Sequence, residues 1–297
     1  MWPFISKQIS ECIQQDFIYS FDNFIQRHDW MLNWRNSGTQ GALLLAEGAN
    51  PNDTASYADF RLKDYAPTLM HQEALGFMEA NKDQPFFLYY ASPIPHLPLQ
   101  APKKWVDYYR KKLGAEAPYT DKSYFPNQYP RATYAGMISY LDEQVGDLVK
   151  KLKEMGVYEN TLIIFSSDNG PTYTGGSDTP FFDSAKPFKT AYGWGKGFTH
   201  EGGIRVPMIA SWPNKIAAGS KSEHISAFYD MMPTISDIAG ITPEKNIDGI
   251  SFKQALLGKE QKPHDFLYWE FPSYNGQQAV RMGKWKGIRK KSSNGRS

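Results

Sequence analysis

The sequence contains almost no cysteine. Cys12 is the single thiol among 297 residues, so the chain cannot form an internal disulfide. This fits a cytosolic or a periplasmic protein equally well and does not fix the compartment. An excess of one charge is also absent, because 33 basic and 31 acidic side chains leave a formal net charge of +2. The charge balance therefore gives no case for a nucleic acid or a membrane surface as partner.

Long apolar runs are missing as well. No stretch reaches the roughly 18 apolar residues that a membrane span needs. The first residues, Met1–Gln15, do not read as a signal peptide, because Lys7, Gln8 and Glu11 interrupt the apolar side chains. We expect neither a membrane span nor an export signal in this chain.

The composition nevertheless supports a sizeable core. Hydrophobic residues make up 41% of the chain and aromatic residues 15%, which is typical of a globular protein. A length of 297 residues suits one large α/β domain, or one such domain with a small appendage.

Two helices are predicted with clear signals. Asp64–Asn81 begins with a capping residue, Asp64, and has a proline in the first turn. Tyr134–Met155 carries apolar residues at helical spacing, and Gly156 follows as its C-terminal cap. Asp147 and Lys151 are four residues apart, so we expect them to form an ion pair on the solvent side.

Three apolar runs predict buried strands: Pro85–Ser92, Leu162–Phe165 and Ile204–Pro213. A helix followed by a short turn and a buried strand is typical of α/β proteins, so we expect a mostly parallel central sheet flanked by helices. Ser226–Gly240 predicts a short helix, kinked or split at Pro233.

The character of the sequence changes near Gln261, where short runs with a basic face indicate antiparallel strands. We therefore predict a main domain over residues 1–260 and the start of a small antiparallel-sheet unit over 261–297.

The run "NTLIIFSSDNG" ends its apolar stretch in Asp168, Asn169 and Gly170. Ligands of parallel α/β sheets bind beyond the carboxyl ends of the strands. A carboxylate beside an amide oxygen suits Ca²⁺ or Mg²⁺, and a glycine lets the backbone turn so that both side chains reach one ion. These three residue types also dominate ordinary turns, so the tripeptide alone leaves both interpretations open.

Three motifs occur in a fixed order: "QPFFLYYASPIPHLPLQAP", "TLIIFSSDNGP" and "GKGFTHEGGIRVPMIASWP". With these three motifs, the sequence resembles the sulfatase family of the alkaline-phosphatase-like superfamily over roughly residues 57–290. The resemblance implies an α/β fold and hydrolysis of a sulfate ester. It also implies that Asp168 and Asn169 are metal ligands, usually for Ca²⁺, and that His96 contacts the sulfate ester and protonates the leaving oxygen. Lys196 would bind a sulfate oxygen.

These roles are chemically reasonable. An imidazole can hold and give a proton near neutral pH, and a lysine is a compact charge for a sulfate oxygen. A solvated loop histidine and a solvated surface lysine are the competing interpretations. Around these positions, we expect Glu201-Gly202-Gly203 to be a structural turn. His200 either lines the site or faces solvent, and we favour solvent. Three residues of a predicted substrate-side loop could equally stack on a sugar or pack in the core: Tyr173, Phe181 and Phe182.

The family's nucleophile motif, Cys/Ser-x-Pro-x-Arg, which matures to formylglycine, does not occur. Cys12 lacks the proline and the arginine, and Ser211–Lys215 follows the third motif, which is the wrong place in the chain. The family's early Asp-Asp pair and its Gly-Lys-Trp-His segment are also missing. We therefore expect a fragment that lacks an N-terminal part with the formylglycine, folds marginally because a sheet edge is exposed, and has no sulfatase activity by itself.

Two other functions fit the same residues. One is a phosphoester hydrolase of the same superfamily, since one fold hosts both chemistries. The other is a non-catalytic binder of sulfated glycans. The substrate could be a sulfated small molecule or a sulfated carbohydrate, and the sequence does not fix the oligomeric state. By resemblance alone the protein would be periplasmic, secreted or lysosomal. The basic residues from Arg281 to Lys291 could suit an anionic polymer, but alternation on an exposed strand explains them as well.

Overall fold

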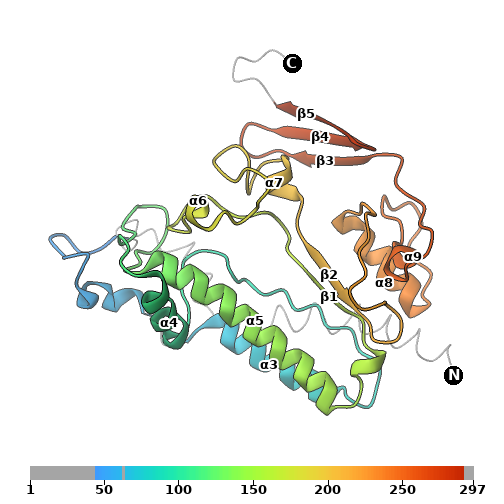
Figure 1. The fold of residues 1–297 in the computed structure, drawn as a ribbon, viewed down its shortest axis with the longest axis horizontal. Helices are drawn as coiled ribbons and strands as arrows, with labels where there is room; N and C mark the ends of the chain where they lie inside the picture. The colour runs from blue at the N-terminus through green and yellow to red at the C-terminus, as the bar shows by residue number, and fades with distance from the viewer. Residues whose placement is uncertain (1–43, 62–63, 291–297) are drawn as a thin grey trace. The chain divides into compact units, whose positions relative to one another are not determined.

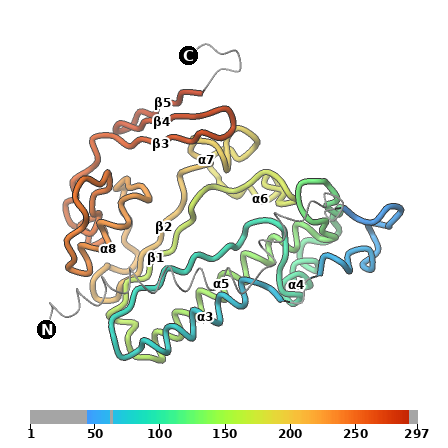
Figure 2. The backbone as a smooth tube through the Cα atoms, turned by 180° about the vertical axis from the view of Figure 1, so that it is seen from behind, coloured from blue at the N-terminus to red at the C-terminus, as the bar shows by residue number. Residues whose placement is uncertain are grey.

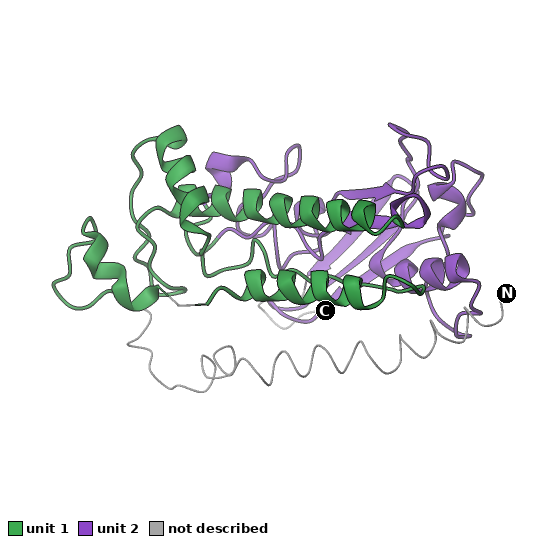
Figure 3. Ribbon diagram, turned by 90° about the horizontal axis from the view of Figure 1, so that it is seen from below, with its two compact units in different colours: residues 1–157, 174–177 green, residues 158–173, 178–297 purple. Residues whose placement is uncertain are grey.

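The structure is a computed structural model that describes residues 44–61 and 64–290. These residues form two compact units, residues 1–157 with 174–177 and residues 158–173 with 178–297 (Figure 3). Cys12 and Lys291 lie outside the described residues. No helix among the described residues is both long and apolar enough to cross a membrane.

The described part of the first unit contains four helical elements: η2 (Thr54–Phe60), α3 (Ala66–Ala80), α4 (Lys103–Leu113) and α5 (Pro130–Glu154). Both helices predicted from the sequence are present, as α3 and α5 (Figure 1). Gly156 follows α5 with a φ of +72°, the left-handed conformation expected of a C-terminal cap. The capping role predicted for Asp64 is wrong, because Tyr65 is the N-cap residue of α3 and no side chain caps it.

The predicted pair between Asp147 and Lys151 is also wrong. Asp147 instead accepts from the His71 Nε2 of α3 at 3.3 Å. Lys151 contacts Glu79, near the end of the same helix. Both side chains therefore bridge α5 to α3, and the fully buried Gln144 donates to the carbonyl of Pro67 at 2.8 Å. A spacing of four residues permits a local pair, but a packed neighbouring helix offered both groups a partner.

The predicted strand Pro85–Ser92 is an extended segment without strand pairing among the described residues. Its side chains contact the helices instead. The Phe86 ring meets Phe77 of α3 at 6.0 Å, and the Tyr90 hydroxyl donates to Gln144 of α5 at 3.2 Å. The apolar run correctly indicated an extended backbone, but a strand also needs a partner strand for its hydrogen bonds.

Among its described residues, the second unit contains two sheets and several short helices. Its elements are η3 (Tyr158–Asn160), β1 (Ile163–Ser166), α6 (Thr179–Phe182), α7 (Glu201–Ile204), β2 (Met208–Ser211), η4 (Phe228–Asp230), α8 (Met231–Ala239), α9 (Lys253–Leu256), β3 (Leu267–Phe271), β4 (Gln277–Met282) and β5 (Trp285–Lys290).

The two predicted strands that flank the Asp-Asn-Gly turn pair with each other, and they run antiparallel. β1 and β2 lie side by side in Figures 1 and 2, with Ile163 opposite Ser211. This differs from the parallel pairing we expected, because an apolar run specifies burial and not the direction of the neighbouring strand. Full burial of this run was wrong too, since Phe165 is exposed and so is Ile209 on β2.

The antiparallel C-terminal strands are present as the three-stranded sheet β3-β4-β5. The predicted split of Ser226–Gly240 is also present, because the turn η4 precedes α8 and Pro233 lies in the first turn of that helix. The second compact unit contains both sheets, and the predicted division at residue 261 stays a prediction.

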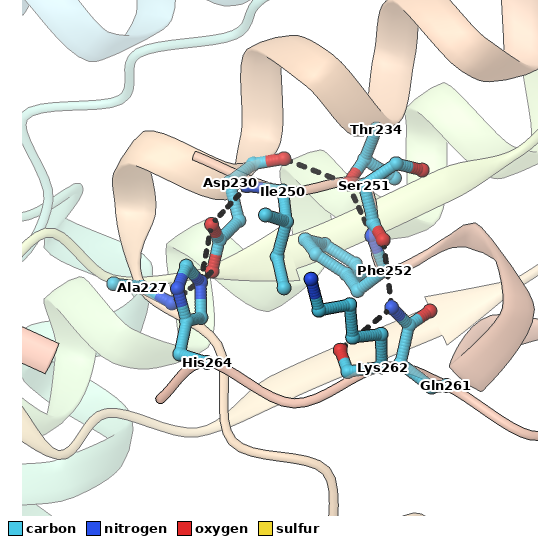
Figure 4. A network of polar contacts seen from close by, with 9 residues as sticks. All are labelled: Ala227, Asp230, Thr234, Ile250, Ser251, Phe252, Gln261, Lys262 and His264. Atoms are coloured by element: carbon cyan, nitrogen blue, oxygen red, sulfur yellow. Dashed lines mark hydrogen bonds and ion pairs between the residues drawn. The ribbon is translucent and has the colours of Figure 1, made fainter. Parts of the chain in front are cut away.

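Asp230 fastens the region around α8 (Figure 4). Its fully buried carboxylate accepts hydrogen bonds from the backbone N–H groups of Ala227 and Ile250, at 2.8 and 2.9 Å, and from His264 Nε2 at 2.8 Å. The carbonyl of Asp230 accepts from the Thr234 hydroxyl at 2.7 Å. One side chain thus joins segments that are more than thirty residues apart in sequence.

Candidate functional site

Asp168 and Asn169 lie in the turn that directly follows β1. The Asp168 side chain is exposed and makes no hydrogen bond with the described residues. Asn169 is half-buried, and its Nδ2 donates to the carbonyl of Gly170 at 3.1 Å. The Asn169 Oδ1 makes no hydrogen bond with the described residues, so that oxygen is available as an acceptor. Two hard oxygen donors therefore stand next to each other at the strand end.

Gly170 fixes this turn against a second loop. Its N–H donates to the carbonyl of Gly203 at 2.8 Å. A β-carbon at Gly170 would lie 1.8 Å from the carbonyl oxygen of Gly202, and one at Gly202 would lie 2.0 Å from that of Lys189. Only glycine allows these backbones to approach so closely. The glycines of "SDNG" and "HEGG" are thus one packing motif.

Lys196 is held beside the same turn. Its backbone N–H donates to the carbonyl of Pro171 at 3.0 Å, one residue after Gly170. A β-carbon at Gly195 would lie 2.7 Å from that same carbonyl oxygen. The Lys196 side chain is half-buried and forms neither a hydrogen bond nor an ion pair within the described part of the chain. The structure therefore brings Lys196 together with Asp168 and Asn169 through backbone contacts.

Gln277, which no sequence motif pointed to, supports the Lys196 loop. Gln277, the first residue of β4, is buried, and its Nε2 donates to the carbonyl of Gly197 at 2.9 Å. Its Oε1 accepts from the N–H of Thr199 at 3.2 Å. The amide therefore clamps the backbone on both sides of Phe198. Gly197 itself has a φ of +85°, which glycine adopts readily.

Glu201 joins the same region to the C-terminal sheet. Its carboxylate accepts from Lys286 of β5 at 2.7 Å, and Arg281 of β4 and Arg205 lie within 3.7 Å. Burial alone would raise the pKa of Glu201, but the hydrogen bond from Lys286 and the three cations lower it below its ordinary value. Glu201 therefore has a structural role, as we expected, because it links its own turn to the C-terminal sheet. Two of the basic C-terminal residues, Arg281 and Lys286, are its partners.

The aromatic residues near Lys196 form a connected group. The ring centroid of Phe198 lies 5.3 Å from Tyr192 and 5.2 Å from Tyr274. Tyr173 contacts Tyr192 at 5.2 Å, and burial together with Tyr274 raises the pKa of Tyr173 to about 12. Tyr173 therefore packs against other aromatic side chains, which agrees with core packing, one of its two interpretations. Phe181 remains exposed.

His200 differs from the solvent-facing residue that we expected. It is half-buried, and its ring stacks on Trp194 at a centroid distance of 4.3 Å. Burial lowers the pKa of His200, and the charges of Lys290 and Lys286 lower it further. The histidine is thus a neutral, packed ring near neutral pH.

His96 belongs to the first unit. It is exposed between the buried residues Ile94 and Leu97. Its backbone N–H donates to the carbonyl of Pro93 at 2.7 Å, and its Nδ1 lies 2.7 Å from the carbonyl of Leu97. A carbonyl can only accept, so Nδ1 carries a proton and Nε2 is the nitrogen free to act on a ligand.

The residues present match part of a calcium site. Asp168 and Asn169 supply the hard oxygen atoms that Ca²⁺ or Mg²⁺ prefers. Among the described residues, no group of three or more acidic, histidine or cysteine side chains could hold a metal ion. Since Ca²⁺ takes six to eight oxygen ligands, the pair would bind an ion only together with further ligands.

Comparison with known proteins assigns the class. The sulfatase family profile matches residues 7–241, and that of the C-terminal part of N-sulphoglucosamine sulphohydrolase matches residues 191–293. The chain belongs to the sulfatase family. The resemblance noted in the sequence is thereby confirmed.

Curated relatives agree with this assignment. Human arylsulfatase A is 33% identical over 210 residues, which cover 69% of this chain and 36% of that protein. Mouse N-acetylgalactosamine-6-sulfatase is 30% identical over 227 residues, which cover 73% and 37%. The chain thus spans little more than a third of the length of these relatives.

Solved structures confirm the α/β fold class. The crystal structure of Ps i-CgsB is 33% identical, with a TM-score of 0.62 over 77% of this chain and 47% of that one. The phosphonate monoester hydrolase of Agrobacterium radiobacter is 20% identical, with a TM-score of 0.56 over 90% of this chain and 60% of that one. The second likeness shows that the fold is shared and carries no further argument.

Proposed function

We propose that the protein containing this chain hydrolyses the sulfate ester of a sulfated carbohydrate. One observation carries the proposal: in a chain of the sulfatase family, backbone contacts hold Lys196 beside the Asp168–Asn169 turn. A lysine beside two oxygen donors that would hold a metal ion would bring two cations to one sulfate group. Such preorganised charge stabilises the charge that develops during ester cleavage.

Each residue has a distinct role in this proposal. The ammonium of Lys196 has no partner among the described residues, so it is free to bind a non-bridging sulfate oxygen. In its doubly protonated form, His96 would give a proton from Nε2 to the leaving oxygen. Nδ1–H meanwhile donates to the carbonyl of Leu97, which fixes the orientation of the ring. Asp168 and Asn169 would hold Ca²⁺, or Mg²⁺, which when bound polarises the sulfate.

The nucleophile we propose is a formylglycine derived from a Cys/Ser-x-Pro-x-Arg segment. Residues 1–297 contain no such segment. The catalytic reaction is therefore assigned to the whole protein. The chain described here contributes substrate binding, proton transfer and two metal ligands.

A carbohydrate substrate is supported by two structural relatives. Ps i-CgsB has been solved in complex with k-i-k-neocarrahexaose, and that complex is 32% identical to this chain. A more distant structure, 20% identical, was solved with its substrate D-glucosamine-2-N,6-O-disulfate. These ligands belong to those proteins, and they guide the choice of substrates to test here.

Competing esters provide the test. Release of sulfate and of phosphate is measured for the whole protein with matched sulfate and phosphate esters of one sugar, with and without a calcium chelator. We expect faster turnover of the sulfate ester and a loss of activity with chelation. Preference for the phosphate ester would support the phosphoester hydrolase that shares this fold. Tight binding without turnover of either ester would support a non-catalytic glycan binder.

A further inference from the structure

The loop that carries Lys196, together with the end of β5, presents a surface that the proposed hydrolysis does not use. It consists of Lys189, Tyr192, Trp194, His200 and Lys290, which we call the Trp194 surface. We propose that the Trp194 surface binds a second sulfate group, on the sugar next to the one that is hydrolysed. The inference rests on the proposed function, because it defines the substrate further as a carbohydrate with more than one sulfate.

Aromatic rings hold the two lysines of this surface in place. The ammonium of Lys189 lies over the Trp194 ring, 4.7 Å from its centroid, and the same ring stacks on His200. The ammonium of Lys290 lies 5.7 Å from the centroid of Phe198. Cation–π contacts of this kind restrict the motion of a flexible lysine side chain and leave its positive charge in place. Both ammonium groups are therefore positioned before any ligand arrives.

These two lysines lack the acidic partner that nearby basic residues have. Lys286, Arg281 and Arg205 all surround Glu201. No ion pair joins Lys189 or Lys290 to a carboxylate in the part of the chain that the structure describes. Burial is the main cause of the lowered pKa of His200, and the charge of Lys290 lowers it further. Lys189 and Lys290 are therefore available to bind an anionic ligand, because Glu201 already pairs with three other basic residues.

An exposed ring makes a sugar the best fit among anionic ligands. Tyr192 is 68% exposed, yet its ring is held edge to face by Tyr173 and Phe198, at 5.2 and 5.3 Å. A fixed, exposed aromatic ring can receive the C–H face of a sugar with little loss of conformational entropy. The ammonium of Lys290, over the Phe198 ring that contacts Tyr192, or that of Lys189 over Trp194, can then receive a sulfate. Lys196 is four residues from Tyr192 on the same loop, so one oligosaccharide can reach both.

Binding of two matched disaccharides tests the inference. One carries a single sulfate and the other carries a second sulfate on the neighbouring sugar. Calorimetry with the 297-residue chain compares the wild type with Lys189→Ala, Lys290→Ala and Lys196→Ala. Lys284→Ala is the matched control, because Lys284 precedes β5 whereas Lys290 ends it. Circular dichroism checks that each variant folds.

We expect the wild type to prefer the disulfated sugar. Lys189→Ala and Lys290→Ala should each weaken its binding about fivefold, as for one partly exposed ion pair, and leave the monosulfated sugar unaffected. Lys284→Ala should change the affinity for neither sugar. Equal affinity of the wild type for both sugars, no binding of either, or an equal effect of Lys284→Ala would overturn the inference.

The variant Lys196→Ala separates this inference from the proposed function. Weaker binding of both sugars in Lys196→Ala, without any effect of Lys290→Ala, would support the proposed function and reject the second sulfate site. An effect of Lys290→Ala on the disulfated sugar, without any effect of Lys196→Ala, would support the Trp194 surface and count against the role of Lys196.

Discussion

The side chain of Gln277 donates to the carbonyl of Gly197 across a separation of 80 residues. It also accepts from Thr199, so the C-terminal sheet holds the backbone that carries Lys196. Replacing Gln277 with Leu leaves two backbone groups without partners in a buried place. We expect a loss of about 1–3 kcal/mol in the free energy of unfolding. Sulfate esters should bind roughly tenfold more weakly to the folded variant, because Lys196 is no longer held in place.

The neighbouring residue provides the control for this experiment. Gln278 lies on the opposite face of β4 and contacts Glu270 at 3.3 Å near the surface. Gln278→Leu should change neither the free energy of unfolding nor the binding of sulfate esters noticeably. Denaturant unfolding and calorimetry measure the two effects. Equal behaviour of the two variants would mean that Gln277 does not position the loop.

Gly170→Ala tests the packing between the Asp-Asn-Gly turn and the loop beside it. The added β-carbon would lie 1.8 Å from the carbonyl oxygen of Gly202, so the two backbones must separate. We expect a loss of about 3 kcal/mol or more in unfolding free energy. Gly146→Ala in α5 is the control, since its β-carbon meets no atom within 4 Å. That change should be neutral or stabilise by up to about 1 kcal/mol.

The carboxylate of Glu201 should make stability depend on pH. Its folded-state pKa is lowered overall, so its contribution is present above its unfolded pKa and is lost as the pH falls through the folded pKa. We expect Glu201→Gln to lower the unfolding free energy by about 1 kcal/mol at pH 7. The difference from wild type should shrink below about pH 4.5. Unfolding curves between pH 3 and 7 measure it, and a pH-independent difference would argue against the ion pairs as its source.

His96→Gln tests the proton donor in the whole protein. A sugar alkoxide needs a proton to leave, whereas nitrophenolate leaves readily without one. We expect turnover of a sugar sulfate to fall by about 10²–10⁴-fold and that of nitrophenyl sulfate to fall much less. Lys196→Ala is the comparison, because a sulfate-binding charge acts on both substrates alike. If His96→Gln slowed both substrates equally, His96 would not be the general acid.

The buried carboxylate of Asp230 should be costly to remove. Asp230→Ala leaves two backbone N–H groups and His264 without their acceptor (Figure 4). We expect a loss of about 3–5 kcal/mol in unfolding free energy. Asp237→Ala, at a half-exposed pair with Lys253, should cost only about 1 kcal/mol. Thermal and denaturant unfolding compare the two, and similar losses would show that burial of Asp230 is not decisive.

Local patterns predicted the local elements well. The helical spacing in α5 and the glycine after it both correspond to the structure, because backbone preference and periodicity act over a few residues. The same patterns misassigned Pro85–Ser92, whose hydrophobic side chains pack on helices without a strand partner. They also misassigned the partners of Asp147 and Lys151, which lie on α3 more than seventy residues away.

The sequence by itself determined the family, because its ordered motifs are typical of that family. The residues of the candidate site follow from the same motifs and stay a prediction. The sequence also determined that Asp168 and Asn169 follow an extended apolar run. Only the tertiary structure decided that β1 and β2 run antiparallel, that Glu201 collects three cations and that Gln277 holds the Lys196 loop. The physical reason is distance along the chain: these contacts join groups that no local preference connects, and they form only when the whole unit packs.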